Sequence, residues 1–288
     1  MLSNQEEKSR LLPPGGISAI LMHNILEVDV HTYAGIVFCD VDGTILPHGE
    51  RTVSSDFFAL VEEARQADFL VCISSGRFHE ALLPLFSPVS SKVVFSASNG
   101  CRVLYQGREL FPNHGIEYSL AEQITSSLHS WGATALISTT EAICLPTVAR
   151  EQLKAKSYLA KGYTRFFDTF SEIPGDVLQI TAVCDGNMPA ILERSREAWG
   201  STFHVVTTGK EMFDICPTSK GISLRAISEH FSVPIAHTYA FGDDENDIPM
   251  LEAAGKGYIM GNAHQGVKDR EFEHCYDLIG TIRKILAK

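Results

Sequence analysis

The chain has 288 residues, of which 44% are hydrophobic and 20% charged, with a formal net charge of −11. This composition is typical of a soluble globular protein with one large domain or two modest ones. The acidic balance disfavours phosphate backbones and anionic lipid, so we expect neither a nucleic-acid nor a membrane partner. The sequence has neither a run of about 20 apolar residues nor a signal-peptide pattern, which favours a cytoplasmic location.

Cysteines and common nucleotide motifs give no catalytic centre. The seven cysteines are odd in number, widely scattered and without a CxxC pair, which is typical of free buried thiols in a reducing compartment. The patterns GxxxxGK[ST], GxGxxG, HExxH and GxSxG are all missing from the sequence. Any chemistry must therefore come from other residues.

The regular part of the chain begins after an N-terminal extension, residues 1–34, which has no clear period. Whether this extension is an arm, an added helix or a segment upstream of an alternative start at Met22 stays open. Apolar runs at 36–39, 69–73 and 92–95 then alternate with helical stretches that begin near 55 and 77. Such continuous apolar runs with short loops predict a Rossmann-like parallel α/β core.

The pattern changes between residues 101 and 208. Gln106-Gly107-Arg108 gives a hairpin signal, and further strand and helix patterns follow, as in an α+β domain. The parallel pattern resumes with a strand at 212–216, a helix at 219–231 and the apolar run 238–241. We therefore expect a core domain of residues 35–100 and 209–288, interrupted by an inserted α+β cap domain of residues 101–208.

Polar side chains end several of the apolar runs. In a parallel sheet the ligand site lies beyond the carboxyl ends of the strands, so these residues should converge. They are Asp40, Asp42, Ser75, Lys220, Asp243 and Asp247. Several carboxylates with a lysine and a hydroxyl nearby predict a site for Mg²⁺ and a phosphate group.

Each of these residues also has a simpler interpretation. Asp-x-Asp-Gly is common in turns, and Ser75 suits a helix N-cap. The acids of GDDEND suit the first turn of a helix, which leaves Asp243, the nearest to the strand, as the best candidate there. Lys220 is predicted in the first turn of a helix, where a cation is unfavourable unless it reaches into water or meets an anion.

Taken in order, these motifs resemble the haloacid dehalogenase superfamily of phosphohydrolases. The matching motifs are DVDGT, Ser75-Gly76-Arg77, PTSKG and GDDENDIPML. Ser98-Asn99-Gly100, the long insertion and Met260-Gly261-Asn262-Ala263 are further similar to the Cof-type, cap-type IIB sugar-phosphate phosphatases. The resemblance covers nearly all of the chain from residue 35 and is weakest in the insertion.

The resemblance implies a role for each matching residue. Asp40 would be the nucleophile that forms an aspartyl-phosphate, and Asp42 the general acid and then base. Mg²⁺ would be held by Asp40, the Asp42 carbonyl and Asp243, with Asp247 at the same site. The phosphate would be bound by residues on several loops, namely Ser75, Gly76, Arg77, Asn99, Lys220 and Asn246, with His79 a further candidate near the substrate.

The implied activity is Mg²⁺-dependent hydrolysis of small phosphate monoesters, with sugar phosphates as the expected substrate class, through an aspartyl-phosphate intermediate. A phosphomannomutase-like phosphomutase is the main enzymatic alternative, although GDDENDIPML lacks a longer loop expected there. A non-hydrolytic sugar-phosphate-binding regulatory protein would have lost the nucleophile or the acid, and neither is lost. A receiver domain would lack the insertion, and the oligomeric state stays open between monomer and homodimer.

Overall fold

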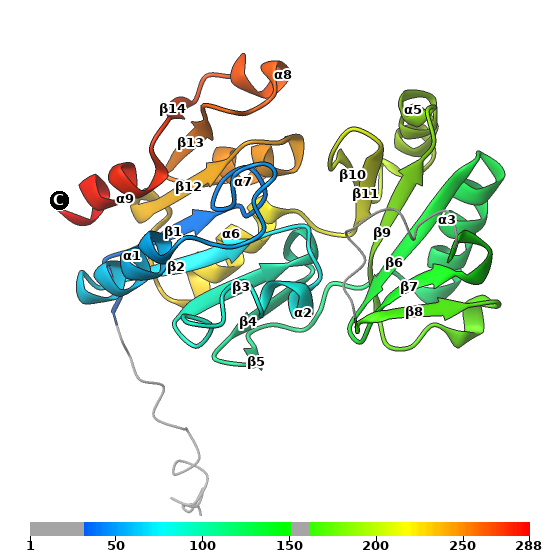
Figure 1. The fold of residues 1–288 in the computed structure, drawn as a ribbon, viewed down its shortest axis with the longest axis horizontal. Coiled ribbons are helices and arrows are strands. Elements are labelled where there is room, and N and C mark those ends of the chain that lie inside the picture. Colours follow the sequence, from blue (N-terminus) through cyan, green and yellow to red (C-terminus); the bar gives the residue numbers. More distant parts are fainter. Residues whose placement is uncertain (1–31, 151–161) are drawn as a thin grey trace, which may run out of the picture. The chain divides into compact units, whose positions relative to one another are not determined.

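The computed structural model describes residues 32–150 and 162–288, and its secondary structure forms two separate β-sheets (Figure 1). The expected N-terminal extension falls, except for its last three residues, outside the described residues. One sheet has eight strands and the other six. Each sheet has its own apolar core.

The larger sheet is parallel at its centre, as expected. Its order is β14-β13-β12-β1-β2-β3-β4-β5, and β1 pairs in parallel with both β2 and β12. The strands are β1 (Gly35–Cys39), β2 (Phe69–Ser74), β3 (Val93–Ala97), β4 (Arg102–Tyr105), β5 (Arg108–Glu109), β12 (Thr238–Gly242), β13 (Lys256–Met260) and β14 (Glu273–Cys275).

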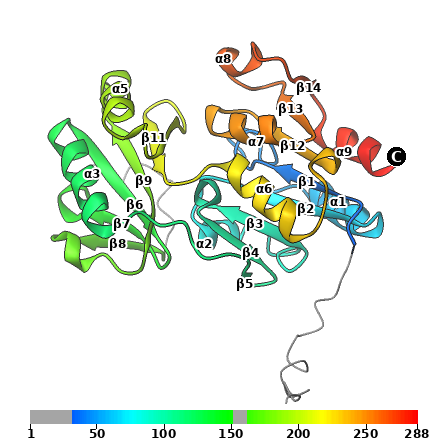
Figure 2. The same ribbon diagram turned by 180° about the vertical axis from the view of Figure 1, so that it is seen from behind.

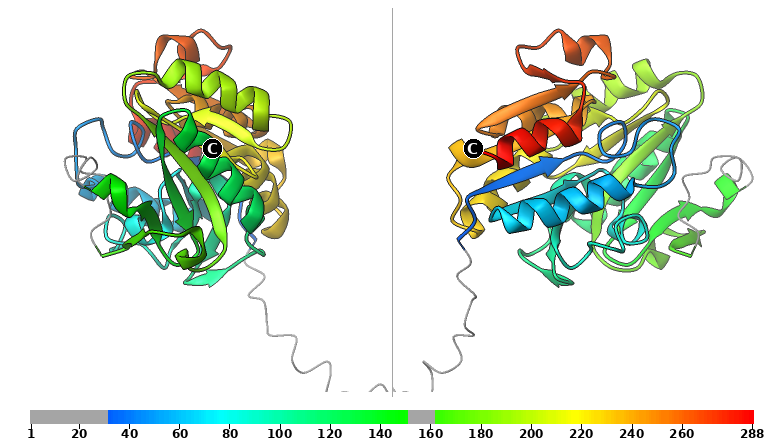
Figure 3. Two further views of the ribbon diagram at one scale, coloured as in Figure 1. Left: turned by 90° about the vertical axis from the view of Figure 1, so that its right-hand side faces the viewer. Right: turned by 60° about the vertical axis from the view of Figure 1, so that its left-hand side comes forward.

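Helices cover both faces of this sheet because its central strands are apolar on both sides. Along β1, Val37 and Cys39 belong to one core, while Ile36 and Phe38 belong to the other. Helices α1 and α9 pack on the first face (Figure 3, right), and α6 and α7 on the second (Figure 2). The helices are α1 (Ser55–Gln66), α2 (His79–Leu82), α6 (Lys220–His230), α7 (Ile248–Ala253), α8 (Gln265–Lys268) and α9 (Leu278–Leu286), with 3₁₀ turns at Ser98–Gly100, Ile235–His237 and Glu245–Asp247.

The smaller sheet is mostly antiparallel and has helices on one face. Its order is β10-β11-β9-β6-β7-β8, and α3 and α5 pack against the face that carries Ile180 and Ala182 of β9 (Figure 3, left). The elements are α3 (Tyr118–Ser130), β6 (Ala133–Thr139), β7 (Ile143–Pro146), β8 (Thr164–Phe167), β9 (Val177–Cys184), α5 (Met188–Trp199), β10 (His204–Thr207) and β11 (Met212–Cys216), with 3₁₀ turns at Thr147–Ala149 and Phe170–Glu172.

Two elements belong to a different sheet from the one predicted for them. The hairpin of β4 and β5 was expected in the insertion, but β4 pairs antiparallel with β3 and extends the core sheet. The strand β11 was expected in the parallel core, but it pairs antiparallel with β9 and β10. An apolar run or a hairpin signal does not specify which partner strand it pairs with, so local sequence could not decide either case.

Local signals gave other elements correctly, such as the first helix. Helix α1 begins where it was predicted, and the Ser54 hydroxyl caps it by accepting from the Phe57 amide. All seven cysteines are buried and free, as expected. Within the described residues, no helix is both long enough and apolar enough to cross a bilayer.

Candidate active site

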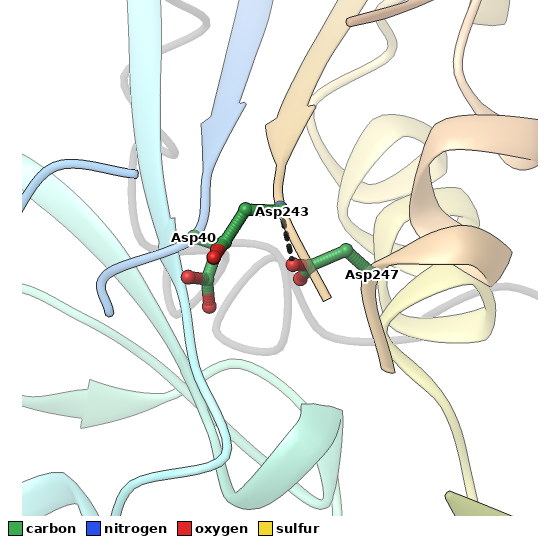
Figure 4. Close-up of side chains that lie close together, drawn as sticks. All are labelled: Asp40, Asp243 and Asp247. Carbon is green, nitrogen blue, oxygen red and sulfur yellow. Dashed lines mark hydrogen bonds between the residues drawn. The ribbon is translucent and has the colours of Figure 1, made fainter. Parts of the chain in front are cut away.

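Three carboxylates meet at the carboxyl edge of the core sheet. Asp40 follows β1, Asp243 follows β12, and Asp247 ends the 3₁₀ turn before α7 (Figure 4). One oxygen from each lies within 4.8 Å of the others, and all three side chains are buried. The predicted convergence of residues far apart in sequence is therefore present for these three acids.

Lys220 neutralises part of this acidic cluster. Its Nζ donates to Asp40 Oδ1 and to Asp247 Oδ1, each at 2.6 Å, and the residue is only 1% exposed. Ser219 caps α6 in front of it, by accepting from the Ile222 amide. The alternative of a lysine that reaches into water is thus wrong.

Asp247 organises the loop that carries Asp243. Its Oδ2 accepts from the backbone amides of Asp243 at 3.0 Å and Asp244 at 3.1 Å, while its Oδ1 faces Lys220. Both oxygens of Asp247 are therefore engaged by the protein. The side chain is better placed to hold this loop and Lys220 than to serve as a main metal ligand.

Asp243 approaches the DVDGT loop closely because that loop contains a glycine. Gly43 has φ +88°, and a Cβ there would lie 2.1 Å from Asp243 Oδ2. The Thr44 hydroxyl donates to Asp243 Oδ1 at 3.3 Å, and Asn262 Nδ2 donates to the Gly43 carbonyl at 2.7 Å. A side chain at position 43 would push the two loops apart.

The electrostatics of the cluster reflect an excess of negative charge. Burial, and then the charge of Asp247, raise the pKa of Asp40 above its ordinary value, while Lys220 opposes the shift. Burial, with the nearby Asp247 and Asp244, raises the pKa of Asp243 to about 7. Burial alone would lower the pKa of Lys220, but Asp247 and Asp40 raise it, so the lysine stays charged.

This donor set fits a hard divalent cation. Three buried carboxylates face one lysine, so the cluster keeps net negative charge that burial makes unfavourable. Carboxylate oxygens are the ligands that Mg²⁺ prefers in proteins. Lys220 bonds one oxygen of Asp40, and Asp243 meets the Thr44 hydroxyl at Oδ1 and His48 Nε2 at Oδ2, each at 3.3 Å.

Asp42 lies apart from the three buried acids. Its side chain is 51% exposed and receives two hydrogen bonds from Arg77, from Nε at 2.7 Å and from Nη2 at 2.5 Å. Its carboxylate is not among the clustered acids of the described residues. Its expected role at the metal would thus use the backbone carbonyl.

Apart from Lys220 on α6, the predicted phosphate-binding residues lie on three loops that are bonded to one another. Ser75 is buried, and its hydroxyl accepts from the Arg77 amide at 3.2 Å, as in a local cap. The backbone amide of Asn99 donates to the Ser75 carbonyl at 2.9 Å. Asn246 Nδ2 donates to Asn99 Oδ1 at 3.0 Å, which joins these loops to the loop of Asp243.

Comparison with known proteins decides the family. Residues 37–271 match the model of the haloacid dehalogenase-like hydrolases. The chain belongs to this family. The resemblance in the motifs is therefore confirmed.

Two relatives of this haloacid dehalogenase-like hydrolase are phosphatases. Phosphatase YwpJ of Bacillus subtilis is 26% identical, over 81% of this chain and 91% of that protein. The HMP-PP phosphatase of Citrobacter koseri is 24% identical, over 78% of this chain and 83% of that protein. The expected enzyme class, a phosphoric monoester hydrolase, is confirmed at the level of the family and these relatives.

A solved structure confirms the architecture. The subclass IIB sugar phosphatase BT4131 has a TM-score of 0.70 at 18% identity, over 88% of this chain and 97% of that one. At this identity the likeness concerns the fold alone. The hydrolase core with an inserted second domain, predicted from the alternation of strand and helix patterns, is thus the observed fold class.

Sequence reasoning missed several residues that shape this hydrolase site. Thr44 and Asn262 belong to two of the matching motifs. Nothing in those motifs indicated that Thr44 contacts Asp243 or that Asn262 contacts Gly43. Asp214 received no role, although an acid inside the apolar run MFDIC of the printed sequence is an unusual residue in a buried strand. That signal could have marked Asp214 as a candidate.

Proposed function

We propose that this hydrolase cleaves small phosphate monoesters, with sugar phosphates as the substrate class and Mg²⁺ as the cofactor. The main support is the buried cluster of Asp40, Asp243, Asp247 and Lys220 at the carboxyl edge of parallel strands. A phosphate ester needs positive charge around its oxygens and a nucleophile in line with phosphorus. The cluster offers both once a cation is bound.

In this mechanism Asp40 attacks phosphorus, and an aspartyl-phosphate forms as the ester oxygen leaves. Lys220 holds Asp40 through one carboxylate oxygen, which leaves the other free to react. Asp42 protonates the leaving oxygen and then takes a proton from the water that hydrolyses the intermediate. To do so, Asp42 has to turn from Arg77, with which it pairs at the exposed edge of the site.

The metal and the phosphate would each be held by residues around Asp40. The side chains of Asp40 and Asp243 and the carbonyl of Asp42 would hold Mg²⁺. When bound, this ion would neutralise phosphate charge next to the carboxylate nucleophile. Ser75, Gly76 and Asn246, with Arg77 and Asn99, would surround the phosphate, and we propose that the inserted domain acts as the cap over it.

A panel of phosphate esters tests this function. With Mg²⁺ present, we expect the purified protein to release inorganic phosphate from several sugar phosphates, and excess EDTA to abolish the release. ³¹P NMR of the same reactions distinguishes the alternatives. Isomerised sugar phosphate without net phosphate release would favour the phosphomutase, and binding without any turnover would favour the regulatory protein.

A further inference from the structure

Asn99 lies in a backbone conformation that its surroundings must stabilise. Ser98, Asn99 and Gly100 have φ values of 48°, 55° and 95°. Positive φ is unfavourable for a residue with a Cβ, by about 1 kcal/mol or more. A run of such residues persists only where other contacts fix it, and here the run directly follows core strand β3.

The contacts that fix Asn99 come from the second sheet. Its Nδ2 donates to Asp214 Oδ2 at 2.8 Å and to Gln179 Oε1 at 3.1 Å. Asp214 lies on β11 and Gln179 on β9, which are neighbouring strands of that sheet. The Asn99 Oδ1 accepts from Asn246, so this single amide joins two strands of the second sheet to the loop of Asp243.

Asp214 is the anionic anchor of this arrangement. It is 1% exposed and accepts from Asn99 and from the Thr181 hydroxyl, the latter at 2.6 Å. A Cβ at Gly76 would lie 3.4 Å from Asp214 Oδ2, which places the carboxylate against the Ser75–Arg77 loop. Because its two oxygens are bonded and it is buried, Asp214 does not contact the substrate in this arrangement.

We propose that Asp214 is a positioning residue for catalysis in the core domain. Through Asn99 it fixes Asn246 and the loop of Ser75 and Gly76 relative to Asp40 and Lys220. The second domain would thus contribute a part of the phosphate site itself, besides covering it. The proposal rests on the phosphatase function proposed above.

This role differs in its kinetics from recognition of the leaving group. A residue that positions phosphate-binding loops affects all esters alike, because every ester presents the same phosphate. A residue that contacts the sugar changes the order of preference among esters. A residue that only stabilises the fold lowers the folded fraction and leaves the turnover of folded molecules unchanged.

The experiment exchanges donor and acceptor between the two side chains. Asp214→Asn removes the anionic acceptor, and Asn99→Asp places two carboxylates against each other. The double variant Asp214→Asn/Asn99→Asp restores one donor facing one acceptor and the original charge. Ser138→Ala is the control. Ser138 faces Gln179 in the register of β6 and β9. Among the described residues, no hydrogen bond joins the Ser138 side chain to a core loop.

Each variant is assayed with Mg²⁺ on p-nitrophenyl phosphate and two sugar phosphates, with inorganic phosphate as competitive inhibitor, and its thermal midpoint is measured. We expect each single variant to lose about tenfold or more in kcat/KM, equally for all esters, and to bind phosphate more weakly. The double variant should recover most of both losses. Ser138→Ala should behave as wild type.

Three results would overturn the inference while the phosphatase function stands. They are wild-type kinetics in both single variants, a changed order of ester preference, and a loss of activity that follows only the folded fraction and is not recovered in the double variant. A wild-type protein that releases no phosphate from any ester would instead overturn the proposed function.

Discussion

Lys220 is a buried cation whose free-energy cost depends on the carboxylates around it. It opens helix α6, where the helix dipole disfavours a cation by several tenths of a kcal/mol, and complete burial adds a larger desolvation cost. The two carboxylates at 2.6 Å offset these costs. A lysine fixed between Asp40 and Asp247 keeps its positive charge inside the site, and its contact with phosphate stays a prediction.

Asp40→Asn should abolish turnover and keep the fold. The amide retains an oxygen for Lys220 but is no nucleophile, so we expect kcat to fall by about 10³-fold or more while inorganic phosphate still binds. Phosphate release measures the first effect, and protection of the thermal midpoint by phosphate measures the second. Activity within tenfold of wild type would reject Asp40 as the nucleophile.

Asp42→Asn should slow the reaction according to the leaving group. An alkyl oxygen needs a proton as it departs, whereas p-nitrophenolate leaves without one. We therefore expect a much larger loss of kcat on sugar phosphates than on p-nitrophenyl phosphate. Arg77→Met removes the observed partner of Asp42 and a proposed phosphate ligand but leaves the acid in place, so we expect it to lower kcat/KM on both substrates alike. Equal losses on both substrates in Asp42→Asn would count against the acid/base role.

Asp214 should make stability depend on pH. Burial raises its pKa from 3.8 to about 6, so the folded state binds the proton more tightly than the unfolded state does. Its contribution is complete below about pH 4 and is lost as pH rises through about 6, by up to about 3 kcal/mol. Urea unfolding of wild type and Asp214→Asn should therefore diverge between pH 4 and 7, in favour of the Asn variant. A constant difference over that range would contradict the shift.

At the scale of elements, periodicity and strand ends were predictable because they depend on local sequence. The apolar runs indicated the central strands, and the helices predicted to begin near 55 and at 219 are capped in the structure by the hydroxyls of Ser54 and Ser219. Asp40, Asp243 and Lys220 converge because parallel strands end at one edge. The sheet membership of β4, β5 and β11 was not predictable, because it depends on partners distant in sequence.

The contacts between loops could not be predicted from the sequence either. Arg77 pairs with Asp42, and Asn99 pairs with Asp214, which lies more than a hundred residues further along the chain. Both pairs depend on side-chain geometry that no local pattern encodes. Ser75, Gly76 and Asn246 were named as phosphate ligands, and the structure adds how their loops are joined. Their direct contact with phosphate stays a prediction.

A second set of hydrogen bonds joins helix α5 and strand β10 to the loop of Asp243. The Glu245 carboxylate accepts from Arg196 Nη2 at 2.8 Å and from the Thr207 amide and hydroxyl. Because Arg196 and Glu245 are over one-third exposed, we expect Arg196→Ala to cost only about 1 kcal/mol or less, and less still at high salt. A double-mutant cycle with Glu245→Gln in urea, at low and high salt, measures the coupling. A salt-independent coupling above about 2 kcal/mol would contradict this estimate.

At the scale of the whole molecule, we propose that the two domains divide the recognition of a substrate. The core residues proposed for catalysis face phosphate, metal and the bridging oxygen, which all phosphate monoesters share. Discrimination among esters must then come from the inserted domain, which can also exclude water during attack on phosphorus. Hydrogen-bond partners left unpaired by the wrong ester would each cost about 1 kcal/mol or more.

Exchange of the inserted domain with that of a related phosphatase tests this division. The chimera must keep Asp214 and Gln179, because these residues bond to the core loops and their loss would reduce the hydrolysis of every ester. With them kept, we expect Mg²⁺ and inorganic phosphate to bind as in wild type, while the order of kcat/KM among sugar phosphates changes toward that of the donor. Isothermal titration calorimetry measures the binding, and phosphate release measures the order. If a chimera that folds and binds both probes kept the original order, specificity would have to reside in the core, and the division of recognition between the two domains would be wrong.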